Sequence, residues 1–399
     1  MLTPADHVAA PENALLRWCG RRGVADSRPL AQLLDGPLDW WLVLRQAQRH
    51  GLLALLYDCL VGRGLVDRVP PEPRQALATS ARIVAARSLL LTGELLRMVR
   101  AMGEEGVPVL PFKGPVVAVA AYGDLALRSF GDLDILTPEE NLQAARRVLA
   151  SLGYRPALAL AAGQEKAYLQ SECALQFHNP ERGHVVELHW RFSERNASVD
   201  LPPAEIWSRA GRVDLAGGSV ATLCPEDLVL YLCVHGAKHQ WERFEWVCCL
   251  AELIRSHPAA DWNIILEQAR RHRILRILRL GLCLTQSLCD VNLPEPVARL
   301  GSDRVAQAVA RRVADLSFAP PQGAPHYQER AARYLFMMRV RENWKDRSRI
   351  LFHSAFKPPH PDADEWIHLP PRLAFLYHLF RPVRLIGQYG AVAWRYYLR

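Results

Sequence analysis

Apolar residues at three- and four-residue spacing dominate the first hundred residues of the chain. This spacing places the apolar side chains on one face of a helix. The longest such stretch covers residues 73–102 and is followed by Gly103 and Gly106, which favour the end of a helix. The pattern therefore predicts a helical N-terminal region over residues 1–104.

The pattern changes at Val107, where short apolar runs begin to alternate with helical stretches. Runs of this length between turn residues are typical of strands. The expected strands are VPVLPF (107–112), DLDIL (132–136), ECALQFHN (172–179) and HVVELHW (184–190). A small-residue helix after Pro115 and a helix over 138–152 separate the first three. This alternation predicts a mixed α/β unit, which we place at residues 105–220.

After residue 220 the chain returns to helical spacing, first in CPEDLVLYLCVHGAKH, whose proline and acids suit a helix start. The fold class is therefore predicted to be α+β, with a mixed-sheet domain flanked by helical regions at 1–104 and 221–399. The stretch RRHRILRILRL could be a basic nucleic-acid face, but its leucine spacing favours an ordinary amphipathic helix. The aromatic stretch 373–397 favours packed terminal helices over contact with a membrane surface.

Composition narrows the class of protein only slightly. A net charge of +8 permits polyanion binding, nucleic acid included, without requiring it. The nine cysteines form no paired C-x-x-C array, which favours reduced thiols in a cytosolic protein. The N-terminal residues lack the pattern of a signal peptide, and no apolar run is long enough to span a membrane. We therefore expect a cytoplasmic protein without stable membrane insertion.

Two carboxylates stand at alternate positions, Asp132 and Asp134, at the start of an expected strand. Alternate residues of a strand face the same side, so the two side chains should lie together. Their mutual repulsion is relieved by a divalent cation, and Mg²⁺ is commonly held by one or two carboxylates together with substrate phosphates. An isolated D-x-D is more often a solvated strand end, so the pair needs support from its surroundings.

That support comes from residues before and after the pair. Lys113 and Gly114 lie between a strand and a helix, where free backbone N–H groups and an ammonium can hold a phosphate. Arg128 could reach a phosphate or fix the carboxylates. Glu187 lies in the alternating strand HVVELHW and would be a third carboxylate, with His189 on the same side. Three carboxylates beside an anion-binding turn are the parts that two-metal phosphoryl transfer needs.

These segments resemble a known family. FKGPVVAVAAYGDLALRSFGDLDIL, the later VELHW, and CPEDLVLYLCVHGAKHQWERFEWVCCLAELI are similar to the uncharacterised nucleotidyltransferase family of the polymerase-β-like superfamily. A related pattern, K-G-G followed by R-x-S-x-D-x-D, belongs to the nucleotidyltransferase toxins. The wider superfamily usually has Gly-Ser at the turn, where this chain has Lys-Gly-Pro. That departure puts the phosphate contact normally made by the serine in doubt.

The resemblance implies a mixed sheet in which the two aspartates and Glu187 lie on neighbouring strands. These three residues would be catalytic and would bind Mg²⁺ or Mn²⁺. The resemblance also implies a nucleotide site: Lys113 and Gly114 would contact the triphosphate, and Arg128 would support them. His239 and Trp241 would border the substrate cleft, and His189 and His239 are expected among the nucleotide-binding residues. His235 and His239 also have metal-ligand spacing on a helix, but without H-E-x-x-H packing is favoured over zinc.

The expected activity is transfer of a nucleoside monophosphate from a triphosphate, with ATP as the expected donor, to a hydroxyl or phosphate of an acceptor. Members of the resembling family occur near genes for lasso-peptide and other natural-product biosynthesis, which suggests a peptide or small-molecule acceptor. A tRNA 3′ end is the alternative acceptor. A non-catalytic nucleotide-binding scaffold and an antitoxin-like partner protein are the alternatives to an enzyme. The chain has neither a P-loop nor a G-x-S-x-G motif, which weakens the ATPase and serine-hydrolase hypotheses.

Overall fold

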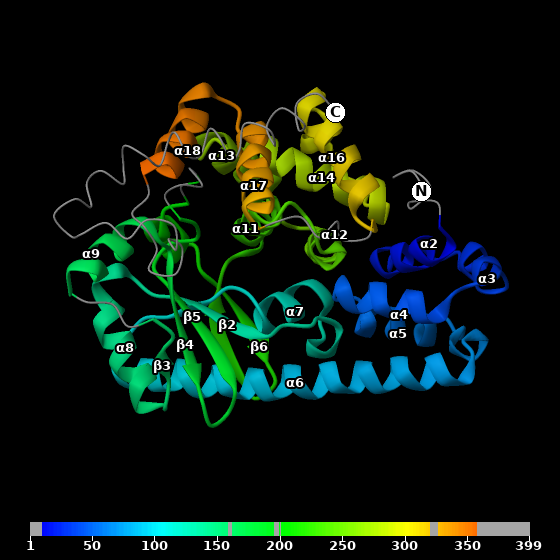
Figure 1. The fold of residues 1–399 in the computed structure, drawn as a ribbon, viewed down its shortest axis with the longest axis horizontal. Coiled ribbons are helices and arrows are strands. Elements are labelled where there is room, and N and C mark those ends of the chain that lie inside the picture. Colours follow the sequence, from blue (N-terminus) through cyan, green and yellow to red (C-terminus); the bar gives the residue numbers. More distant parts are fainter. Residues whose placement is uncertain (1–9, 159–161, 195–198, 200, 320–325, 357–399) are drawn as a thin grey trace.

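A computed structural model describes residues 10–158, 162–194, 199, 201–319 and 326–356. The long helix α6 (Pro71–Glu104) extends along one side of the molecule (Figure 1). The N-terminal helices lie over one half of α6 and the central sheet lies over the other half. The later helices form a layer on the far side of the sheet from α6. The α+β prediction is confirmed.

The N-terminal region packs around α6. Buried leucines and methionines of this helix recur at helical spacing, among them Leu77, Leu91, Leu95 and Met98. Its first half packs against α4 and α5, whereas its second half contacts β2, β7 and α8. α6 therefore contributes side chains both to the core of the N-terminal helices and to the core beneath the central sheet. The elements before it are α2 (Pro11–Arg17), η1 (Trp18–Gly20), α3 (Arg28–Leu34), α4 (Trp40–Arg49), α5 (Leu53–Gly62) and η2 (Val66–Arg68).

The central sheet has the strand order β1-β2-β5-β4-β3. Its strands are β1 (Leu110–Pro111), β2 (Asp132–Leu136), β3 (Arg155–Pro156), β4 (Ala174–Asn179) and β5 (His184–His189). β2 and β5 pair in parallel, and the other pairs are antiparallel. Four of these strands were expected from the sequence. The edge strand β3 was not, and the first expected strand shrinks to two residues.

The elements linking the strands cover the sheet. They are α7 (Pro115–Tyr122), η3 (Leu125–Leu127), η4 (Glu139–Asn141), α8 (Leu142–Ser151) and α9 (Ala162–Ser171). α10 (Pro203–Ser208) precedes an unexpected hairpin of β6 (Gly211–Leu215) and β7 (Gly218–Thr222). The hairpin joins β1 through Thr222, whose hydroxyl donates to the carbonyl of Pro111 at 2.7 Å. The alternation along β2 puts Leu133 and Ile135 in the core on the face opposite Asp134.

The C-terminal layer is entirely helical within the described residues. Its elements are α11 (Pro225–Lys238), α12 (Phe244–Ser256), α13 (Trp262–Arg271), α14 (Leu275–Cys289), α15 (Glu295–Ala298), α16 (Arg304–Leu316), α17 (His326–Val340) and α18 (Trp344–Phe356). The basic stretch that begins at residue 270 spans the end of α13 and the start of α14. α14 buries Ile277, Leu278 and Leu280, as the amphipathic interpretation predicts.

Trp241 corrects one expectation. Its side chain is only 1% exposed, so it is a core residue and does not border a cleft. The backbone turns sharply there, with φ of 56° at both Gln240 and Trp241, because the Trp241 N–H donates to the carbonyl of Gly236 at 2.7 Å. The ring lies against Gly236, and a Cβ built on Gly281 would meet it at 3.3 Å. Trp241 therefore fastens α11 to α14.

We propose the division into a region 1–104, a catalytic domain 105–220 and a region 221–399, with α6 joining the first two. The aromatic stretch 373–397 lies outside the described residues. Among the described helices, none combines the length and apolar character that crossing a membrane requires. All nine cysteines are free thiols, and most of them are buried.

Replacing Gly236 by alanine is expected to lower the free energy of unfolding by about 1–3 kcal/mol, the usual cost of overpacking a core. The new Cβ would lie only 2.5 Å from the Trp241 ring, which the surrounding helices hold in place. Gly93→Ala in α6 is the matched control, because no atom lies within 4 Å of its built Cβ. That change should raise stability by about 0.4–1 kcal/mol. Urea denaturation measures both, and equal effects would contradict the packing of Trp241.

Candidate active site

The parallel pairing of β2 and β5 brings the predicted carboxylates together. Asp134 is in register with Glu187, and Asp132 is in register with Val185. His189 follows Glu187 by two positions and faces the same side of the sheet. Its Nε2 lies 3.0 Å from Asp134 Oδ1 and 3.1 Å from Glu187 Oε2. The side chains of the two strands thus form one polar cluster.

Asp134 is the centre of this cluster. Its Oδ1 accepts from Lys113 Nζ at 2.5 Å as well as from His189, while its Oδ2 is buried without a hydrogen-bond partner in the described residues. Burial raises the pKa of Asp134, but the nearby Lys113 and His189 lower it by more. The net pKa lies well below its ordinary value, so Asp134 is a carboxylate at neutral pH.

His189 stands between two acids. Burial lowers the pKa of its imidazole, but its hydrogen bonds, led by that to Asp134, outweigh burial and raise the pKa well above its ordinary value. Its Nδ1 lies 3.3 Å from the carbonyl of Arg191, which this nitrogen meets as an N–H donor. The backbone therefore fixes the ring so that Nε2 points at Asp134 and Glu187.

Asp132 stands slightly apart from the others. It is partly exposed, and no hydrogen bond to its carboxylate occurs within the described part of the chain. Burial raises the pKa of Asp132, and the charge of Asp134 raises it further. The potential ligand atoms of Asp134, Glu187 and His189 lie within 4.8 Å of one another, and this grouping has His189 in the place where we expected Asp132.

The residues present suit a divalent cation. Asp134 Oδ2 is a buried acceptor without a donor, and the Glu187 side chain is 30% exposed, so both can accept a new partner. Carboxylate oxygens suit Mg²⁺ and Mn²⁺, and an imidazole nitrogen is a good ligand for Mn²⁺ and heavier metals. Asp134, Glu187 and His189 could hold an ion, and the Asp132 carboxylate feels the charge of Asp134.

The turn before α7 carries Lys113 to the cluster. Gly114 has φ of 56° and ψ of −122°, a conformation that side chains strongly disfavour. Pro115 begins α7, as expected for a first helical position. Burial lowers the pKa of Lys113, but Tyr231 and Asp134 raise it by more, so the net pKa lies above its ordinary value. Lys113 is therefore a fixed positive charge at the cluster.

Arg128 lies behind this turn. Its side chain is about 10% exposed, its Nη1 donates to the carbonyl of Gly114 at 3.5 Å, and its Nε lies 3.4 Å from Glu245 Oε1. We expected Arg128 to contact phosphate or fix the carboxylates. The observed contacts hold the backbone of the turn and link it to α12, and contact with a phosphate stays a prediction.

Glu245, which the sequence analysis did not single out, anchors Arg128. The carboxylate is 1% exposed and also accepts from Arg243 at 2.7 Å. Its backbone N–H donates to the carbonyl of His50, and Gly51 leaves room for its side chain, because a built Cβ would lie 2.1 Å from Glu245 Oε2. An acid between Phe244 and Trp246 was the available signal, since carboxylates are rarely buried without a partner.

His239 lies at the end of α11 and contacts other aromatic residues. Its ring centroid lies 4.8 Å from that of His235 and 5.3 Å from that of Trp246. Burial and, to a smaller extent, the charge of Lys238 together lower the pKa of His239 to about 3, so the ring is neutral at physiological pH. The only cluster in the described residues with three suitably close metal-ligand side chains is the one around Asp134, so zinc at His235 and His239 has no third ligand there.

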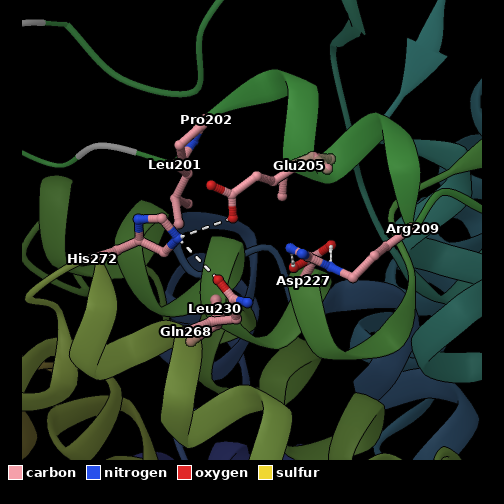
Figure 2. A pocket seen from close by; sticks show the side chains of 9 residues that line it. Leu201, Pro202, Glu205, Arg209, Asp227, Leu230, Gln268 and His272 are labelled. Carbon is pink, nitrogen blue, oxygen red and sulfur yellow. Dashed lines mark hydrogen bonds and ion pairs between the residues drawn. The ribbon is translucent and has the colours of Figure 1, made fainter.

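A separate small pocket lies between α10, α11 and α13 (Figure 2). Its charged groups already have partners: Arg209 forms two bonds to Asp227, at 2.8 and 3.1 Å, and His272 lies 3.0 Å from Gln268. The residues lining it contain none of the predicted site residues. The Arg209–Asp227 pair holds the end of α10 to α11.

A parallel strand pair that presents acids beside a lysine-bearing turn is an arrangement that phosphoryl-transfer sites use. The chain belongs to the uncharacterised nucleotidyltransferase family, whose model matches residues 36–290, more than half of the chain. The predicted family is therefore confirmed, and it makes the protein a transferase of this general kind with a nucleotide substrate. No curated protein and no solved structure matches the chain.

Glu245→Ala is expected to lower the free energy of unfolding by about 3–5 kcal/mol, because it leaves the buried Arg128 without its counter-charge. Chemical denaturation measures the loss. Glu242→Ala, an exposed acid three residues earlier, should change stability by no more than about 0.5 kcal/mol. A Glu245→Ala protein as stable as the Glu242→Ala protein would contradict the stabilising role of the Arg128–Glu245 ion pair.

Proposed function

We propose that this protein is a metal-dependent enzyme that transfers a nucleoside monophosphate, with ATP as donor, to an acceptor hydroxyl or phosphate. The observation that carries the proposal is the meeting of Asp134 and Glu187 on parallel strands beside Lys113. A metal-free role would leave Asp134 Oδ2 a buried acceptor without a donor, which is unfavourable.

The reaction forms a bond between the acceptor oxygen and the α-phosphorus of the nucleotide. The bond from the α-phosphorus to the oxygen bridging it to the β-phosphorus breaks, and pyrophosphate leaves. The acceptor's proton passes to a carboxylate, and Glu187 is our candidate because its side chain is partly exposed beside the cluster. Lys113 and the Gly114 turn would hold the triphosphate and offset charge on the leaving pyrophosphate.

Asp132, Asp134 and Glu187 would hold Mg²⁺ or Mn²⁺, with His189 next to them. The metal would polarise the α-phosphate and neutralise charge that develops on the leaving group. His189 orients the carboxylates through its bonds to Asp134 and Glu187. Arg128 fixes the backbone of the Lys113–Gly114 turn by donating a hydrogen bond to the carbonyl of Gly114.

For the acceptor we propose a hydroxyl on a peptide or small natural product. The alternatives are a tRNA 3′ end and, outside enzymes, a nucleotide-binding scaffold without turnover. The proposed site retains three carboxylates and a lysine, which favours turnover over a scaffold. Sensitivity of the labelled product to nuclease or to protease distinguishes the two classes of acceptor.

Transfer of ³²P from the α-position of each of the four NTPs, with Mg²⁺ or Mn²⁺ and a cell lysate as the acceptor pool, tests the activity. Pyrophosphate release is measured in parallel. Wild-type protein should label an acceptor, and Asp134→Asn should reduce labelling at least about 10³-fold, because it weakens metal binding worth several kcal/mol.

Asp134 is buried, so its variant needs a check on folding. Glu187→Gln changes a partly exposed side chain and should cause a similar loss of labelling with an unchanged unfolding midpoint. Asp67→Asn, at a side chain that is 88% exposed, is the control and should transfer normally. Full labelling by folded Asp134→Asn and Glu187→Gln proteins would overturn the metal assignment.

A further inference from the structure

Four aromatic rings from α11 and α12 form a continuous patch next to the charged cluster. Tyr231 and His235 are stacked with centroids 6.0 Å apart, and His235 lies 4.8 Å from His239. Trp246 closes the group, 5.1 Å from His235 and 5.3 Å from His239. Tyr231 is buried, whereas the other three are partly exposed. We call His235, His239 and Trp246 the aromatic platform.

Tyr231 connects the aromatic platform to the turn that carries Lys113 and Gly114. Tyr231 packs edge-on against Phe112, with ring centroids 5.1 Å apart, and lies close to the charge of Lys113, the residue that reaches Asp134. Phe112 also contacts the His189 ring, with centroids 5.0 Å apart. Three ring contacts in series, His189–Phe112, Phe112–Tyr231 and Tyr231–His235, therefore connect the carboxylate cluster to the platform. A ligand whose phosphates met Lys113 would have its remaining part near these rings.

The chemistry of the platform differs from that of the cluster. Burial lowers the pKa of His235 well below its ordinary value and that of His239 to about 3, so both rings are neutral. Neither ring forms a hydrogen bond within the described part of the chain, although each has one donor and one acceptor nitrogen. A neutral, planar and heteroaromatic surface suits a base far better than a phosphate or a metal.

We infer that His235, His239 and Trp246 form the nucleobase subsite, in which the base of the nucleoside triphosphate stacks on Trp246 and meets the imidazole nitrogens at its edge. This inference rests on the proposed function, since it assumes that the triphosphate occupies the Lys113 turn. It specifies which residues hold the base. It also gives Trp246 the place beside the substrate that we expected for Trp241, which is buried.

The test compares two ligands that share phosphates and differ in the base. Isothermal titration calorimetry with Mg²⁺ measures the binding of ATP and of inorganic tripolyphosphate to each variant. Trp246→Ala should weaken ATP binding about 5- to 100-fold, the usual effect of removing a base-stacking ring, and leave tripolyphosphate unchanged. Trp246→Phe should recover most of the loss, and His239→Ala should weaken ATP selectively as well.

Two further variants complete the design. Lys113→Ala should weaken both ligands, because it removes a phosphate contact. Trp41→Ala, which removes a tryptophan that is 49% exposed in the N-terminal region, should weaken neither. Unfolding midpoints for all variants show that each protein is folded.

The outcomes separate the subsite from the proposed function. A loss restricted to ATP supports the subsite. Equal losses of ATP and tripolyphosphate in Trp246→Ala, or no loss of either, overturn the subsite and leave the proposed function standing. Failure of the wild-type protein to bind ATP overturns both, because the subsite has no ligand without the triphosphate.

Discussion

The structure of the candidate site depends on one buried charge, the Asp134 carboxylate. A carboxylate in this position costs several kcal/mol unless cations or donors face it. Lys113 comes from the turn and His189 from the neighbouring strand, and both point at the same oxygen, Oδ1. The parallel register of β2 and β5, the conformation of Gly114 and the position of His189 each serve this arrangement. The second oxygen remains without a donor, which is why we expect a metal ion there.

The buried Arg128–Glu245 interaction extends this constraint beyond the sheet. Arg128 donates to the carbonyl of Gly114. The backbone N–H of Glu245, in the first turn of α12, donates to the carbonyl of His50. The three parts of the chain therefore meet at one ion pair: the N-terminal region through His50, the sheet domain through Gly114, and the C-terminal layer through α12. Gly51 leaves room for the second ion pair of Glu245, since a Cβ there would overlap the Glu245 carboxylate and the Arg243 guanidinium.

Local patterns in the sequence predicted those parts of the fold that local patterns control. β2 coincides with the expected strand, and α6 and α11 lie within two residues of the stretches that predicted them, because each follows a clear period. The β6–β7 hairpin was missed because each strand has only five residues and both strands are half exposed. In the site, the spacing of Asp132, Asp134 and Glu187 predicted which acids gather. The local alternation placed His189 on the side of Glu187, but the pairing of strands about 50 residues apart decided that His189 rather than Asp132 joins the tight group.

The carboxylate cluster and the aromatic platform also differ in their electrostatics. The sequence of residues along α11 accounts for this difference. Tyr231 faces Lys113, and one turn further along His235 begins a surface without charge. Burial lowers the pKa of both imidazoles, and the nearby charges of Lys113 and Lys238 lower it further, so both rings stay neutral. A helix that presents a tyrosine, then a histidine, then a second histidine at four-residue spacing provides a graded surface from charged to neutral. A nucleotide has the same gradient from phosphate to base, and a free phosphate or an isolated metal ion does not.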